Sequence, residues 1–132
     1  MKISVNEQSQ RFYLATNKWE PVVGHEIKVG VYRFCAIPLD DCINISEVTS
    51  GAKISNIPMS LEVMSVTESK EEAMEFFKKV GEQLKNVIGR TSDFDERLSK
   101  MQKTAFERLG KMPPIEDIDT EWVLADASEL LH

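Results

Sequence analysis

The sequence lacks the compact motifs that identify a catalytic, metal or nucleotide site. Its six glycines are scattered and form neither a phosphate-binding loop nor a dinucleotide fingerprint. Cys35 and Cys42 do not form a C-x-x-C pair, the usual signature of a zinc ribbon or a thioredoxin-type site. The acidic pair Asp40-Asp41 lacks the regularly spaced oxygen ligands and closing glutamate of a calcium loop. We therefore expect no cofactor and no metal, and lean away from an enzyme.

Long apolar runs are also missing. No segment approaches the roughly 20 apolar residues of a membrane-spanning helix. Residues 1–7 lack the apolar core of a secretory signal, so a cytoplasmic location is expected. In that compartment two cysteines are more often free thiols than a disulfide. The length of 132 residues, with 42% hydrophobic and 29% charged residues, is typical of one ordinary globular domain.

Basic residues are absent from the last twenty positions. Residues 113–132 contain six acidic residues and no lysine or arginine, so they carry the whole net charge of −6. The rest of the chain is close to neutral, which argues against direct nucleic-acid binding through a broad basic face. The pair Pro113-Pro114 marks the boundary. We predict a single domain over 1–112, followed by an acidic, apolar-containing C-terminal segment over 113–132.

The first half of the chain is rich in strand-forming residues, which predict strands over 2–5, 11–16, 27–37, 42–48 and 52–57. The longest, 27–37, is apolar on both faces and is expected at the centre of a sheet, with Gly30 as the candidate position for a bulge. The polar residues that alternate along 42–48 and 52–57 predict that one face of the sheet is exposed to solvent. Pro21 argues against a central strand around it, and residues 24–26 are predicted to form a turn. Residues 61–66 fit either a final strand or one helical turn.

Two amphipathic helices are predicted in the second half. The first begins at a capping box formed by Ser69 and Glu72 and repeats apolar residues every three or four positions. Gly89 is expected to end it, and the link to the next helix is short, so antiparallel neighbours are expected. Gly81 lies in the middle of this helix, where glycine costs roughly 1 kcal/mol relative to alanine. Either a close contact explains Gly81 or the helix tolerates it.

The second helix, predicted to restart at Ser92 or Asp93, carries a stripe spaced close to a heptad repeat: Phe94, Leu98, Met101, Ala105, Leu109 and Met112. The stripe is shorter than the roughly 3–4 heptads of a coiled coil. It fits packing against the first helix and the sheet, with a homodimer through the helical hairpin as the alternative. Strands followed by helices predict an α+β fold, in which a mainly antiparallel β-sheet in the N-terminal half packs against a C-terminal helical hairpin.

Four residues of the first half are candidates for a ligand-binding or catalytic pocket between the sheet and the helices: Trp19, His25, Tyr32 and Arg33. His25 stands beside Glu26 and has the chemistry of a general base, although a histidine in a surface turn is the plainer interpretation. Arg33 interrupts an apolar strand, so it needs an ionic partner, an exit to solvent or an anion. No motif links the four residues.

The C-terminal segment mixes acidic residues with apolar ones, which a purely solubilising tail does not need. Its candidate partner-binding residues are Ile118, Glu121, Trp122, Leu124 and Leu130. One interpretation is that the segment folds back, with 121–125 as an edge strand or 126–131 as a short helix. The other is that it offers apolar anchors with acidic flanks to the surface of a basic protein partner.

Three functions remain open from these observations. The first is a small, soluble, non-enzymatic protein-interaction or regulatory accessory protein. The second is an acidic inhibitor of a nucleic-acid-binding machine, of the kind that mobile elements encode, which presents carboxylates where phosphates would bind. The third is a small-ligand-binding domain or enzyme with its pocket between sheet and helices. We expect a protein partner, and neither direct nucleic-acid binding nor membrane association.

Overall fold

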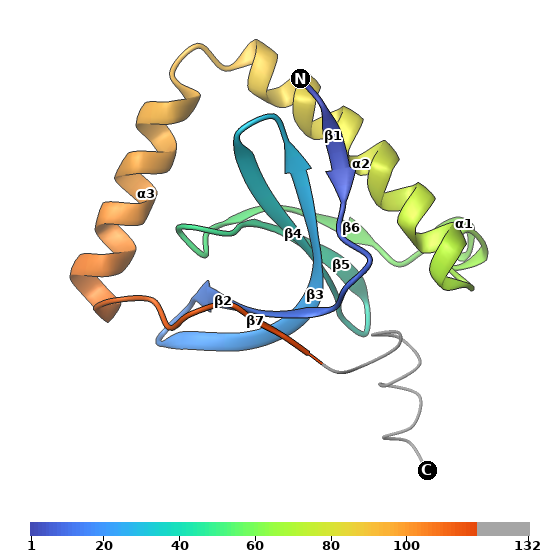
Figure 1. Cartoon of the computed structure of the whole chain (residues 1–132), viewed down its shortest axis with the longest axis horizontal. Helices are drawn as coiled ribbons and strands as arrows, with labels where there is room; N and C mark the ends of the chain where they lie inside the picture. The colour runs from blue at the N-terminus through green and yellow to red at the C-terminus, as the bar shows by residue number, and fades with distance from the viewer. Residues whose placement is uncertain (119–132) are drawn as a thin grey trace.

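A computed structural model describes residues 1–118, and its α+β architecture confirms the predicted fold class (Figure 1). The sheet is antiparallel throughout its described pairings. The strands are β1 (Ile3–Val5), β2 (Gln10–Ala15), β3 (Trp19–Val29), β4 (Tyr32–Pro38), β5 (Cys42–Glu47), β6 (Lys53–Pro58) and β7 (Glu116–Asp117). The helices are α1 (Leu61–Ser65), α2 (Lys70–Arg90) and α3 (Phe94–Leu109). All three helices follow β6 in the chain.

The long strand β3 organises the sheet. Its first half pairs with β2, and its second half pairs with β1 and with β4. The predicted turn at residues 24–26 is wrong, because β3 runs straight through it. Gly24 is needed for a different reason: a Cβ atom there would lie 2.1 Å from the carbonyl oxygen of Ala36. Pro21 lies in the half of β3 that pairs with β2 alone, where the strand tolerates its missing N–H.

The sheet order is β6-β5-β4-β3-β2-β7, with β1 beside β3. The predicted single strand over 27–37 is in fact a hairpin. Gly30 takes a positive φ of 62° and forms a two-residue turn with Val31, which is 84% exposed. Val29 and Tyr32 pair directly on either side of the turn. Glycine at the first turn position is typical of a type II′ hairpin, so Gly30 reverses the chain instead of marking a bulge.

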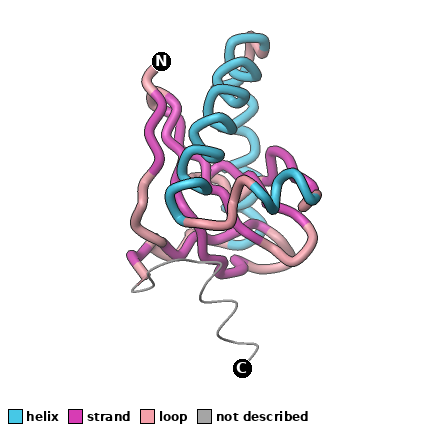
Figure 2. The backbone as a smooth tube through the Cα atoms, turned by 90° about the vertical axis from the view of Figure 1, so that its right-hand side faces the viewer, coloured by secondary structure: helices cyan, strands magenta, loops and turns pink. Residues whose placement is uncertain are grey.

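Both faces of the central strands are buried, which explains their continuous apolar character. One core lies between the sheet and α2 and includes Ile27, Phe34, Ile45 and Phe77. A smaller core on the other face gathers Phe12, Cys35, Ile37 and Val48. Figure 2 shows α2 from the side, lying across the strands. The sheet therefore has no broad wet face at its centre.

The polar residues of β5 do not face solvent, contrary to the prediction from their alternation, whereas Lys53, Ser55 and Asn56 of β6 are exposed as predicted. Asn44 is 7% exposed and Ser46 is fully buried. The Ser46 hydroxyl donates to Asn44 Oδ1 at 2.6 Å, and Asn44 Nδ2 donates to Asn56 Oδ1 on β6 at 3.2 Å. Hydrogen bonding thus satisfies polar groups that burial would otherwise destabilise.

The start of α2 is as predicted. The Ser69 hydroxyl accepts from the backbone N–H of Glu72 at 3.2 Å, which confirms the N-cap. Gly81 is buried against the sheet, and a Cβ there would lie 2.6 Å from Ile3 Cγ2. The close-contact explanation for Gly81 therefore holds. Gly89 does not end the helix through a positive φ, because α2 continues to Arg90. Residues 61–65 form the short helix α1, which decides the ambiguity over 61–66.

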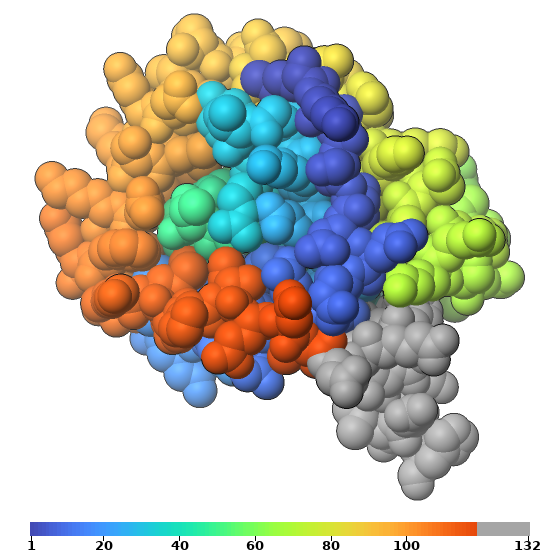
Figure 3. Space-filling view, viewed as in Figure 1, coloured from blue at the N-terminus to red at the C-terminus, as the bar shows by residue number. Residues whose placement is uncertain are grey.

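The two long helices are joined by a short link but do not lie side by side. They diverge from the link, and α2 makes its main contacts with β1 and β3 (Figure 1). In the space-filling view the strands occupy the angle between the two helices (Figure 3). The expectation of antiparallel neighbours is therefore wrong. Ala105 is the one buried residue of α3, whereas the rest of its apolar stripe within 94–109 is half-buried. A helix of this kind is anchored to the sheet at intervals and leaves space beside it.

Candidate functional site

His25 is a core residue and not the surface histidine of a turn. Its side chain is fully buried on β3, and its ring centroid lies 6.1 Å from that of Phe77 on α2. The ring Nδ1 is 3.0 Å from the backbone oxygen of Asn6. Burial lowers the pKa of His25 below its ordinary value of 6.5, with the hydrogen bond to Asn6 acting in the opposite direction. A neutral imidazole fixed in the core between β3 and α2 has the character of a structural group.

Arg33 is held by an ion pair on the opposite face of the sheet. Its guanidinium makes two contacts with the carboxylate of Glu26, Nε to Oε2 at 2.7 Å and Nη2 to Oε1 at 3.2 Å. The hydrogen bond to Glu26 raises the pKa of Arg33 above its ordinary value. The plainer interpretation of Arg33, an ionic partner within the sheet, accounts for its position in an apolar strand.

Trp19 and Tyr32 anchor the two ends of α3. Trp19 Nε1 donates to the carbonyl oxygen of Gly110 at 3.1 Å, and its ring lies edge-on to Phe106 at 5.8 Å. At the other end of α3, the Tyr32 hydroxyl donates to Asp95 Oδ1. That hydrogen bond raises the pKa of Tyr32. The four candidates thus occupy separate places: a core, the opposite face of the sheet and the two ends of α3. The structure does not bring them together into one pocket.

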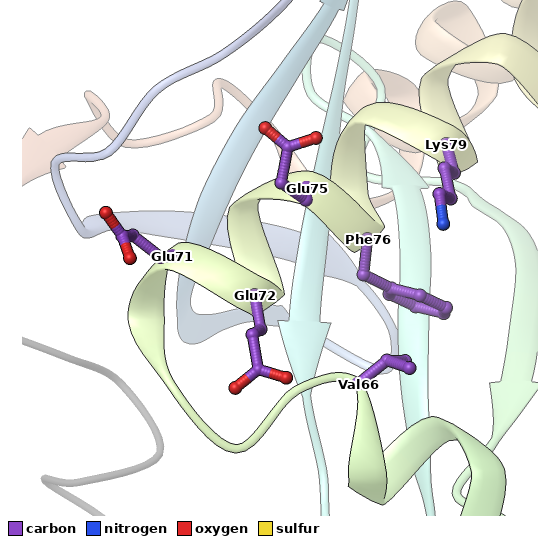
Figure 4. Close-up of a pocket in the computed structure, with 6 residues that line it drawn as sticks. All are labelled: Val66, Glu71, Glu72, Glu75, Phe76 and Lys79. Atoms are coloured by element: carbon purple, nitrogen blue, oxygen red, sulfur yellow. The ribbon is translucent and has the colours of Figure 1, made fainter.

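One open hollow lies elsewhere, along α2 (Figure 4). It has a volume of about 460 Å³ and is formed where the end of α1 meets the first turns of α2. We call its lining the acidic docking surface: Val66, Glu71, Glu72, Glu75, Phe76 and Lys79. Figure 4 shows Val66 and Phe76 close together at the apolar part, with the three carboxylates on the turns before Phe76. The hollow thus joins an apolar floor to an acidic rim.

The helix cap explains why these carboxylates gather here. Glu71 and Glu72 occupy the first turn of α2, where the helix dipole favours negative charge. Glu72 also accepts from the Ser69 hydroxyl at 3.1 Å. Glu75 and Lys79 are spaced for a surface pair, yet no ion pair joins them among the described contacts, and both are exposed. Their charges are therefore open to a ligand.

Apolar exposure is concentrated beside this hollow. Leu61 is 84% exposed, Met64 51% and Val66 39%, and α1 buries none of its residues. These residues belong to one short helix, about 8 Å long, and its C-cap, and Val66 among them lines the hollow. Contiguous exposed apolar groups with a polar rim are typical of binding surfaces for other proteins. Sequence reasoning missed this surface because the exposure of Val66 and of the residues of α1 depends on how α1 meets α2; the apolar residues over 61–66 were the available signal.

The beginning of the acidic C-terminal segment is attached to the sheet. Glu116 and Asp117 pair with β2 as the edge strand β7, and the backbone N–H of Ile118 donates to the carbonyl oxygen of Ser9 at 2.8 Å. Ile115 packs against the smaller core. Folding back therefore begins at residue 115, before the range that the sequence suggested.

Most candidate partner-binding residues of that segment lie outside the described residues. Ile118 is the exception among the five candidates, because it is described, and it is half-buried. Glu121, Trp122, Leu124 and Leu130 belong to residues 119–132, which are not described, and so do the predicted edge strand and short helix. Both interpretations of the segment, folding back and partner binding, stay open for these positions.

Within residues 1–118, no group of three or more His, Cys, Asp or Glu side chains is arranged to hold a metal ion. None of the helices in this part of the chain is long and apolar enough to cross a membrane. Both cysteines are free thiols; Cys35 is buried and Cys42 is half-buried. Comparison with known proteins found no matching family model, no matching curated protein and no matching solved structure.

Proposed function

We propose that this chain is a non-enzymatic protein-interaction protein whose acidic docking surface binds a basic, amphipathic segment of a partner. The observation that carries the proposal is the exposed apolar group at the junction of α1 and α2, bordered by Glu71, Glu72 and Glu75. An amphipathic helix places its apolar side chains in such a hollow and its flanking cations near the carboxylates. The apolar contact supplies affinity, and the carboxylates supply orientation and rate of association.

The open shape of the hollow favours a peptide over a small molecule. It is open to solvent along α2, and Leu61 and Met64 on the adjoining helix α1 are exposed apolar residues. Small-molecule sites generally enclose most of their ligand, and they place a few polar groups at fixed points around an apolar cavity. Here Glu71, Glu72 and Glu75 lie on the first turns of α2, beside the apolar pair Val66 and Phe76. That arrangement complements one face of a helix.

The test uses two synthetic helical peptides, each about five turns long, with a leucine face opposite a face of either lysine or glutamate. Fluorescence anisotropy of the labelled peptides is measured against the full chain. We expect the Leu/Lys peptide to bind with an affinity that decreases as salt increases, because exposed charges are screened. We expect no binding of the Leu/Glu peptide. Equal binding of both peptides would contradict the proposal.

Matched variants separate the docking surface from net charge. The substitution pair E71Q/E75Q removes two carboxylates from the surface, whereas E96Q/E107Q removes two exposed carboxylates from α3, on the other side of the molecule (Figure 1). The first pair should weaken binding by about tenfold, since an exposed ion pair contributes up to about 1 kcal/mol. The second pair should leave binding nearly unchanged. If both pairs weaken binding equally, the peptide recognises only the overall charge.

A second matched pair tests the apolar floor. Val66→Asp places a charge in the hollow, and Val31→Asp places the same charge on the exposed β3–β4 turn. Binding should be lost in the first variant and kept in the second. Circular dichroism confirms that both variants fold. Retained binding by Val66→Asp would remove this hollow from consideration.

A further inference from the structure

A second surface has the opposite character, and it lies between α3 and the start of β6. Two adjoining hollows of about 460 and 360 Å³ share Lys53, Lys100 and Met101, so they form one continuous groove along α3. We call this the basic groove. Its floor is apolar and includes Ile54, Phe94, Met101 and Ala105.

The rim of the basic groove is cationic. Lys53, Arg97, Lys100 and Arg108 line it, and no described lining residue carries a carboxylate. Arg97 is bound to Asp93 at 3.0 Å, and Arg108 donates to the backbone oxygen of Thr16. Lys53 and Lys100 belong to none of the ion pairs described within residues 1–118. Two lysine charges are thus available to an acidic ligand above an apolar floor.

The attachment of α3 explains why the groove exists. The helix is fixed at its first turn through Tyr32 and at its end through Trp19. Between these anchors, Met101 is half-buried and Ala105 is the one residue that reaches the sheet closely. The middle of α3 therefore stands beside the β5–β6 hairpin without closing over it.

The chain itself contains a segment of complementary chemistry. Residues 119–132 include four acidic residues and no lysine or arginine, and Asp119 and Glu121 stand beside Trp122 and Leu124. An apolar anchor between carboxylates matches an apolar floor between lysines. We propose that the basic groove binds residues 119–132 of a second copy of this chain.

The direction of β7 favours a second copy over the same chain. Ala15, at the end of β2, lines the groove. β7 runs antiparallel to β2, from Arg11 toward Ser9, so the chain leads away from Ala15. Ile118 lies about 20 Å from Ala15 along the strand, at roughly 3.3 Å per residue. The segment would have to reverse and retrace this path to enter its own groove, whereas the segment of a second molecule is free of that constraint.

The test is sedimentation velocity of the full chain over a wide concentration range. We expect reversible self-association that weakens as salt increases. The groove variant K53E/K100E and the segment variant D119K/E121K should each raise the dissociation constant of self-association by about tenfold. The control K2E/K78E makes the same charge change as the groove variant at exposed lysines outside the groove, and it should associate like the unmodified chain. K53Q/K100Q, which removes the charges without reversing them, replaces the groove variant if that variant fails to fold.

Mixing the two charge-reversed variants shows whether the basic groove binds the segment of a second copy or that of the same chain. In an equimolar mixture, the reversed groove of one chain meets the reversed segment of the other, and each unmodified groove meets an unmodified segment. Association should return to the level of the unmodified chain. A chain that stays monomeric at every concentration overturns the proposal, because the groove is then empty or filled by the same chain. Failure of the mixture to restore association, with both variants folded, also overturns it.

Discussion

Alanine at Gly81 and alanine at Gly89 should have opposite effects on stability, although both glycines lie in α2. Alanine gains up to about 1 kcal/mol over glycine inside a helix. At Gly89 nothing lies within 4 Å of the added Cβ, so this gain is kept in full or in part. At Gly81 the Cβ would lie 2.6 Å from Ile3 Cγ2 and 3.2 Å from Ile27 Cγ2. Overpacking of this kind costs about 1–3 kcal/mol, which exceeds the gain.

We therefore expect Gly81→Ala to lower the free energy of unfolding by about 1 kcal/mol and Gly89→Ala to raise it by up to about 1 kcal/mol. Urea denaturation followed by circular dichroism measures both values. The double variant G81A/I3A removes the methyl group that clashes, so its loss should be smaller than the sum of the two single losses. If Gly81→Ala stabilises the protein as much as Gly89→Ala does, the packing of α2 against β1 is not as described.

Three further predictions concern buried groups. Glu47 is 2% exposed, and its carboxylate accepts from the backbone N–H groups of residues 49 and 50 at 2.9 Å each. In urea denaturation, E47A should therefore destabilise the protein by about 3 kcal/mol and E47Q by about half as much. Equal effects would contradict the role of the second carboxylate oxygen. Burial raises the pKa of Cys35 to about 12, so a thiol reagent at about pH 8 should label only Cys42 until denaturant is added. Labelling of both thiols in the native protein would show that the smaller core is open. The folded-state pKa of His25 lies below its ordinary value of 6.5, so the unfolded chain binds the proton more readily. The free energy of unfolding should therefore decrease as the pH falls below about 6.5, and H25N should flatten this dependence. An unchanged pH profile in H25N would count against a buried neutral imidazole.

The sequence predicted the fold class because local signals dominate there. The capping box at Ser69 and the apolar repeat of α2 are set by neighbours in the chain. Errors occurred where a residue serves a contact distant in sequence. Gly24 suggested a turn, yet it admits the backbone of β4, and Gly30 suggested a bulge, yet it reverses the chain. A single sequence does not distinguish these uses of glycine.

The site was less predictable than the fold for a related reason. Trp19, His25, Tyr32 and Arg33 were singled out by chemical type, and each has a structural partner within the described residues. The acidic docking surface depends instead on exposure, which arises from how α1 meets α2. The divergence of α2 and α3 likewise follows from the anchors of α3 on the sheet, and loop length alone does not specify it.

The most direct test of the proposed docking surface is to locate the Leu/Lys peptide on the isotope-labelled full chain by NMR chemical-shift mapping. Shift changes confined to α1 and the first turns of α2, with Val66, Glu75 and Phe76 among the most affected, are the predicted result. Changes centred on residues 119–132, or spread over all acidic parts of the surface, would contradict the assignment of binding to this hollow.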